Sequence, residues 1–149
     1  MRIDQDVEPA VRKAYGAAVA GKGDWLDAAL KNIADRGDEF TGRALELAVV
    51  IDAAALHAIH EGRPDDEQIS ALLKHFADTE SWADIDPHVS RRFLTALADH
   101  TPVRDVVSVV ELSDVCFVMG GWLLSSFLPE GKKWTEFLDE VLNAIETSE

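Results

Sequence analysis

The sequence contains a single cysteine, Cys116, and no long apolar segment. One cysteine cannot form a disulfide within the chain, so the fold has to be stable without covalent cross-links, as in a reducing compartment. The first residues lack the apolar stretch of a secretory signal. The longest uncharged run, residues 115–129, is shorter than the roughly 20 residues that cross a bilayer, and it predicts a buried core helix. These absences predict a cytoplasmic protein.

Basic residues are also scarce, with 14 lysines and arginines against 28 aspartates and glutamates and a formal net charge of −14. No third of the chain is basic, and the densest basic positions are pairs such as Arg91 and Arg92. Binding to nucleic acid or to an anionic bilayer needs a cluster of lysine and arginine. We therefore expect neither nucleic acid nor membrane as a partner. A basic protein, a cation or a neutral small molecule stays open.

Motifs of known chemistry are missing as well. The sequence has no Gly-x-Ser-x-Gly elbow, no phosphate-binding loop and no His-Glu-x-x-His zinc motif. His57 and His60 share a helical face, but the helix dipole alone favours histidine near a helix C-terminus. Cys116 lies among apolar neighbours and is expected to be an inert buried thiol. We expect no catalytic residue, no metal site and no cofactor, and the sequence favours a protein that is not an enzyme.

Apolar residues make up 47% of the chain and recur every three or four positions, which is the period of a helix. Clear alternation, the pattern of a half-buried strand, is almost absent. The valines of 103–110 are the one run that could form a strand, but no partner strand is evident. The sequence predicts an all-α, single-domain bundle over residues 1–149, with about six to seven helices in irregular or orthogonal packing. The expected helices cover about 7–20, 25–36, 39–61, 65–78, a segment starting at 87, 102–128 and 132–146.

Local signals set the expected helix ends. Asp24 and Asp86 are expected as N-caps, and Pro87 after Asp86 is a strong start signal. Pro102 repeats that signal for the segment 102–128. A short break near Gly120 and its neighbouring glycine could interrupt this segment.

The most unusual position is Asp52 in the expected helix 39–61. At 100° per residue its side chain falls on the apolar arc, beside Leu45, Ala48 and Leu56. A carboxylate on a core face is costly unless it is paired or protonated. One interpretation is structural, with Asp52 held by a basic side chain, a Trp N–H or a free helix-end amide. The other is that Asp52 lines an internal ligand pocket and has a raised pKa.

Asp114 is the second candidate for such a pocket. It immediately precedes the uncharged run, and Gly121 follows two helical turns later. Small residues beside a half-buried carboxylate could leave space for a ligand. The alternative is that the glycine allows a neighbouring helix to approach closely, while Asp114 lies at the boundary with water.

The expected loop 78–86 is the best candidate for a docking surface. Asp78, Glu80 and Asp84 surround Trp82, so a solvent-facing tryptophan ringed by carboxylates could bind a basic, partly apolar protein. Alternatively, Trp82 and Ile85 fold back onto the core as a plug between the expected helix 65–78 and the helix that starts at 87.

Two functions are therefore predicted. The first is an acidic helical protein-interaction domain, such as a regulator or an immunity-type antagonist of a basic partner. The alternative is a small-molecule-binding protein or enzyme with Asp52 in a central pocket. A homodimer is a further hypothesis, because the apolar segment 115–128 and the last helix both have to be covered.

Overall fold

The computed structural model describes residues 1–148, and these are all-helical, with 76% of the chain in helices and no strands. The predicted fold class is confirmed. The seven α-helices and two 3-10 turns are α1 (Glu8–Val19), α2 (Gly23–Asp35), α3 (Asp38–His60), α4 (Asp66–Thr79), η1 (Ser81–Ala83), α5 (Pro87–Asp99), η2 (Val103–Asp105), α6 (Val109–Ser126) and α7 (Trp134–Thr147).

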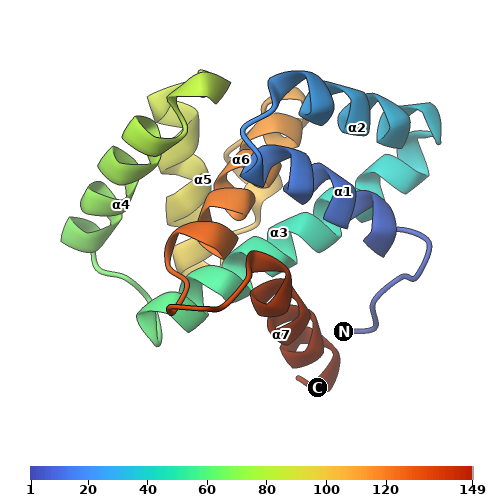
Figure 1. Ribbon diagram of the computed structural model, residues 1–149. Helices are drawn as coiled ribbons and strands as arrows, with labels where there is room; N and C mark the ends of the chain where they lie inside the picture. The colour runs from blue at the N-terminus through green and yellow to red at the C-terminus, as the bar shows by residue number, and fades with distance from the viewer. Residues whose placement is uncertain (149) are drawn as a thin grey trace.

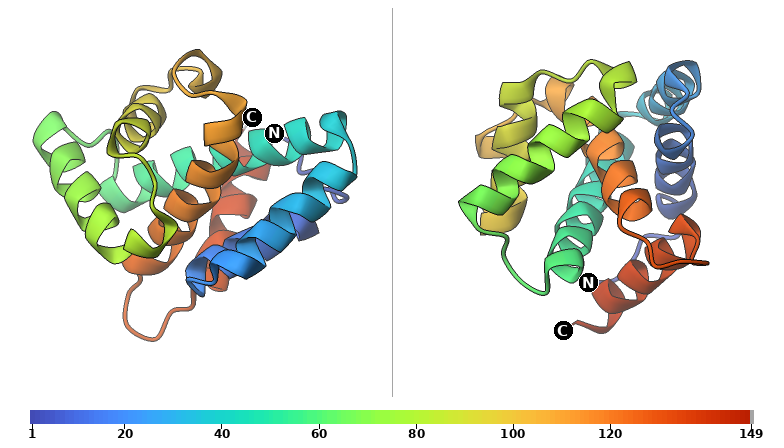
Figure 2. Two further views of the ribbon diagram at one scale, coloured as in Figure 1. Left: turned by 90° about the horizontal axis from the view of Figure 1, so that it is seen from above. Right: turned by 60° about the vertical axis from the view of Figure 1, so that its left-hand side comes forward.

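Two long helices, α3 and α6, cross at the centre of the bundle and pack against each other (Figure 1). The hairpin of α1 and α2 covers one side, and α4 and α5 cover the other, as the two further views show (Figure 2). The C-terminal helix α7 packs against α3 and α6, so that the two chain ends lie near each other. This irregular arrangement buries α6 from several directions.

Polar caps fix several helix ends, and the cap predicted at Asp86 is confirmed. Asp86 accepts a hydrogen bond from the backbone N–H of His88 at 2.8 Å, with Pro87 in the first turn of α5. Asp65 and Gln68 form a reciprocal capping box at the start of α4. The expected cap by Asp24 is wrong, because α2 begins one residue earlier at Gly23 and Asp24 lies inside its first turn.

The expected single segment 102–128 is divided, but at its start rather than at the glycines. Pro102 leads into the 3-10 turn η2, and Ser108 then begins a new helix. Ser108 caps the N–H of Glu111, whose carboxylate accepts the N–H of Ser108 in return, and this satisfies amides at the helix end. Gly120 lies within a continuous α6, so the break expected there is absent.

Helix α6 is the core of the bundle, and the uncharged run forms most of it. By length and composition alone it could cross a membrane, and 61% of its 18 residues are buried inside the fold. Phe117, Met119 and Trp122 are among its largest fully buried side chains. Such burial is typical of the central helix of a bundle.

The glycines of α6 allow neighbouring helices to come close. A Cβ atom at Gly120 would lie 2.0 Å from Oδ1 of Asp52 and 2.5 Å from the ring of Tyr15. A Cβ at Gly121 would lie 3.2 Å from the Cβ of Ala18 on α1. Gly120 therefore sets the distance between α6 and α3, and Gly121 the distance between α6 and α1.

The first prediction concerns this approach. Gly120→Ala should lower the free energy of unfolding by about 3 kcal/mol, because the added methyl group overlaps the Asp52 carboxyl group. Gly42→Ala on α3 is the control, because nothing lies within 4 Å of its Cβ position. It should be neutral or raise stability by up to about 1 kcal/mol. Urea unfolding followed by circular dichroism measures both changes, and equal effects of the two substitutions would contradict the close approach.

Candidate functional site

Asp52 is fully buried, with 0% of its surface exposed, as its helical position predicts. The Tyr15 hydroxyl oxygen lies 2.7 Å from Oδ1 of Asp52 and 3.0 Å from the carbonyl oxygen of Ala48. The partner is thus a tyrosine of α1, which is none of the partners expected from the sequence. The second oxygen, Oδ2, has no hydrogen-bond partner within residues 1–148.

This geometry suits a protonated Asp52. The Tyr15 hydroxyl has one proton, and the Ala48 carbonyl can only accept. If Asp52 is neutral, its own O–H donates to Tyr15 while Tyr15 donates to Ala48, and both short distances are hydrogen bonds. Burial agrees with this, because desolvation raises the pKa of Asp52 well above its usual value. The hydrogen bond that Tyr15 would donate to an ionised Asp52 only partly offsets the effect of burial.

The surroundings of Asp52 are closed. Gly120 lies directly against its carboxyl group, Phe117 meets the Tyr15 ring edge-on, and Cys116 is fully buried nearby. Burial raises the pKa of the Cys116 thiol well above its usual range. None of the four clefts described on the molecule is lined by Asp52. The arrangement can hold a proton inside the bundle, away from these clefts.

Gly121 directly follows Gly120 in α6 but is buried against α1 and not against Asp52. Asp114 is exposed in the second turn of α6, two turns before Gly121. Burial of part of the carboxyl group, together with the negative charge of Asp27 on α2, raises the pKa of Asp114. The structure therefore brings Asp114 to α2, at the surface, and does not bring it to Asp52.

Trp82 is half-buried and packs on the turn between α1 and α2. A methyl group added at Gly21 or Gly23 would lie 3.7 Å and 3.9 Å from its ring. Its indole N–H donates to the carboxylate of Glu80. Burial raises the pKa of Glu80, and this hydrogen bond opposes the shift. Trp82 and Ile85 are partly buried against the core, but Trp82 joins the loop to the hairpin of α1 and α2 and not to the space between α4 and α5 that the plug interpretation expected. Asp78 and Asp84 remain exposed.

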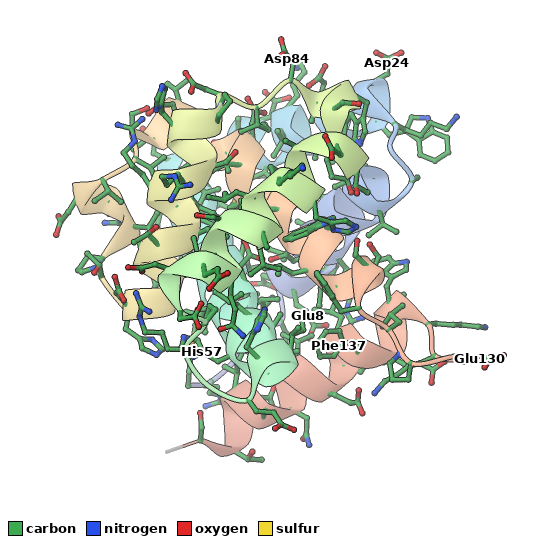
Figure 3. The ribbon with its side chains drawn as sticks, turned by 90° about the vertical axis from the view of Figure 1, so that its left-hand side faces the viewer. Glu8, Asp24, His57, Asp84, Glu130 and Phe137 are labelled. Atoms are coloured by element: carbon green, nitrogen blue, oxygen red, sulfur yellow. The ribbon has the colours of Figure 1, made fainter. Side chains whose placement is uncertain are left out.

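The contact of Trp82 with this turn brings two sets of carboxylates to the same end of the molecule (Figure 3). We call this surface the acidic face, and it consists of Asp24, Asp27, Asp78, Glu80 and Asp84. Within residues 1–148 none of these carboxylates forms a salt bridge.

The exposed tryptophan on this side is Trp25 rather than Trp82. It follows Asp24 in the first turn of α2, 60% of its surface is exposed, and the Lys22 ammonium lies 5.9 Å from its ring centre. The sequence did not indicate that Trp25 is exposed, because a tryptophan in an amphipathic helix is usually buried. Its position outside the apolar stripe of Leu26, Ala29 and Ile33 was the available signal.

Two adjoining clefts of about 610 and 770 Å3 run along the outer side of α3. They share the apolar residues Val49, Val50 and Val103. Val110, next to the second cleft, is 82% exposed. A second copy of the chain could cover apolar surface here, and the homodimer stays a prediction.

The histidines do not gather into a metal site. The rings of His57 and His100 stack at 4.5 Å in the first cleft, and Nε2 of His57 lies 3.2 Å from the Leu97 carbonyl oxygen. His75 instead accepts a hydrogen bond from the Trp122 indole at 3.1 Å. In the described part of the chain no three His, Cys, Asp or Glu side chains are placed to hold a metal ion together.

Comparisons with protein-family models, with curated proteins and with solved structures find no match to this chain. The function therefore has to be argued from the surface and from the buried groups.

The second prediction is a pH dependence caused by Asp52. The unfolded chain releases this proton near pH 4, whereas the folded protein keeps it to a much higher pH. Stability from this group is complete below pH 4 and is lost as the pH rises towards the folded pKa, by about 1.4 kcal/mol per pH unit. Asparagine has the same size and shape as aspartate but does not titrate. Asp52→Asn should therefore remove this pH-dependent contribution to stability.

The measurement is the difference in unfolding free energy between Asp52→Asn and the wild type from pH 5 to pH 8. This difference should grow in favour of the variant as the pH rises. Asp35→Asn, at an exposed position on α2 paired with Lys31, should give a nearly constant difference. A constant difference for Asp52→Asn as well would show that Asp52 is ionised in the folded protein.

Proposed function

We propose that this protein is a non-enzymatic interaction domain whose acidic face binds a basic protein partner. The observation that carries the proposal is the group of carboxylates around Trp82, which lie together and have no salt-bridge partner within residues 1–148. Uncompensated charge of one sign accelerates association with an oppositely charged surface and selects against wrong partners. A cytoplasmic location would suit such a domain.

One feature of the face supports protein rather than ion binding. Trp25 supplies an exposed aromatic ring next to Asp24, and tryptophans are enriched among the residues that dominate the energy of protein interfaces. A bound ion would leave this ring in water, whereas a protein partner could cover it together with the carboxylates.

The alternative, a small-molecule binder that uses Asp52, stays a prediction with weaker support. Asp52 is enclosed by Tyr15 and Gly120 and lines none of the described clefts. Its unpartnered Oδ2 is the one feature that favours this alternative. In a neutral carboxyl group that oxygen carries no full charge, so its isolation is less costly.

The third prediction tests the acidic face. Asp78→Asn, Glu80→Gln and Asp84→Asn are combined in one variant, and a soluble peptide of alternating lysine and serine serves as the basic probe. Affinity should fall about tenfold, since three exposed ion pairs contribute up to about 1 kcal/mol each and not all form at once. Isothermal titration calorimetry at low and physiological salt measures the change. The affinity of the wild type should weaken with salt.

The matched control combines Asp6→Asn, Glu130→Gln and Glu146→Gln, which alter net charge equally at exposed positions outside the face. It should change affinity by twofold or less if the face is the docking surface. An equal loss in both variants would mean that the peptide senses only net charge, and it would overturn the proposal. Trp25→Ala should weaken binding of a probe that also carries leucine.

A further inference from the structure

A small cleft lies where the C-terminal end of α4 meets the N-terminal end of α5, at the loop that contains η1. Its volume is about 210 Å3, below the roughly 300–1,000 Å3 of pockets for drug-sized ligands. Leu73, Phe76 and Ile85 supply apolar lining. A cleft of this size and lining suits one long side chain or an equally small ligand.

Two carboxylates line the same cleft. Glu80 is half-buried, and the Trp82 indole N–H binds its Oε2, which fixes the carboxylate and leaves Oε1 without a partner. Asp84 is exposed, in a left-handed backbone conformation with φ of 51°. Neither forms a salt bridge with a basic side chain of residues 1–148, although Lys74 and Arg91 lie on the adjoining helices.

Ser90 is an independent indication of a ligand. It lines the cleft, only 4% of its surface is exposed, and its hydroxyl forms no hydrogen bond within the described residues. The hydroxyl oxygen is not one of the fully enclosed unpartnered polar atoms, which are Oδ2 of Asp52 and Nε2 of His60, so it keeps contact with the space of the cleft. It is therefore free to accept a hydrogen bond from a ligand N–H that enters the cleft.

A guanidinium group on an aliphatic stem satisfies all of these features. Its five N–H donors lie in one plane, so it can bond to Glu80, Asp84 and Ser90 together. The methylene groups can pack on Phe76 and Ile85. The C-terminal end of α4 also favours positive charge, through the partial negative charge of its last carbonyl groups. An ammonium group has fewer donors and is more strongly hydrated.

We propose that this cleft binds an aliphatic guanidinium group, supplied by an arginine side chain of the basic partner. The proposal rests on the proposed function, because the cleft lies within the acidic face and would give it a specific anchoring point. A free guanidinium metabolite has the same chemistry, and the experiment separates the two sources.

The test is a titration of the 15N-labelled full chain with the blocked tripeptide acetyl-Gly-Arg-Gly-amide, followed by NMR. Amide shifts should change mainly within residues 73–90, with a dissociation constant on the order of 1 mM for so few contacts. The same peptide with citrulline has the same shape without charge and should bind at least about tenfold more weakly. Equal shifts with citrulline, or shifts centred elsewhere, would overturn the proposal.

Substitutions in the cleft provide a second test, with the same titration. Ala77 is exposed and lines the cleft, so Ala77→Phe should fill it without a change of charge and weaken binding about tenfold. Ala71→Phe on the same helix is exposed outside the cleft and should leave affinity within about twofold of the wild type. Ser90→Ala should weaken binding roughly fivefold through loss of one hydrogen bond. Wild-type affinity in Ala77→Phe would overturn the assignment.

A titration with agmatine, a free guanidinium compound, shows whether the guanidinium group comes from a protein side chain or from a small molecule. Tighter binding of the tripeptide than of agmatine assigns the cleft to a protein side chain, and the reverse order assigns it to a free cation and overturns the arginine anchor. The lysine–serine peptide tests the proposed function independently of the guanidinium site. If its affinity falls when the acidic face is neutralised while the arginine peptide binds nowhere, the proposed function stands and the guanidinium site fails.

Discussion

The contact between the buried carboxyl group of Asp52 and the backbone of Gly120 fixes the centre of this fold. The helices α3 and α6 can cross so closely because Gly120 has no side chain at the position that Oδ1 occupies. Tyr15 of α1 contacts the same carboxyl group with its hydroxyl, and its ring lies against Gly120. Three helices distant in sequence thus meet at one polar group, and the neutral form of that group is what the closed surroundings favour.

A polar group of this kind adds little stability but restricts how the helices can pair. Sliding α6 along α3 by one turn would bring a larger side chain against Asp52, and rotating α1 would remove the Tyr15 hydroxyl. The remaining core of α6 is apolar and would tolerate several arrangements. We infer that Asp52 acts as a structural determinant of packing, which differs from the ligand-binding role that a buried carboxylate first suggests.

The carboxylates at the surface are exposed and charged, in contrast to the buried, neutral Asp52. Eight carboxylates of residues 1–148 form salt bridges, as in Arg12 with Asp139 and Arg63 with Asp99, and none of these eight belongs to the acidic face. The half-buried Trp82 holds the two sides of this face together through the turn between α1 and α2. The contact of Trp82 with this turn thereby brings carboxylates of α2 and of the loop 78–86 onto one surface. The small cleft in this surface is lined by apolar side chains as well as by carboxylates.

The sequence by itself determined the all-helical fold, the approximate ranges of most helices, the cap at Asp86 and the inward direction of Asp52. These features depend on residues within a few positions of one another, so that spacing and capping chemistry predict them. It did not reveal Tyr15 as the partner of Asp52, Trp25 as the exposed tryptophan, or Ser90 beside two carboxylates. Only the tertiary structure decided these, because they depend on how closely rigid helices approach across long stretches of chain. That approach is set by side-chain volumes at the crossing points, which no local pattern records.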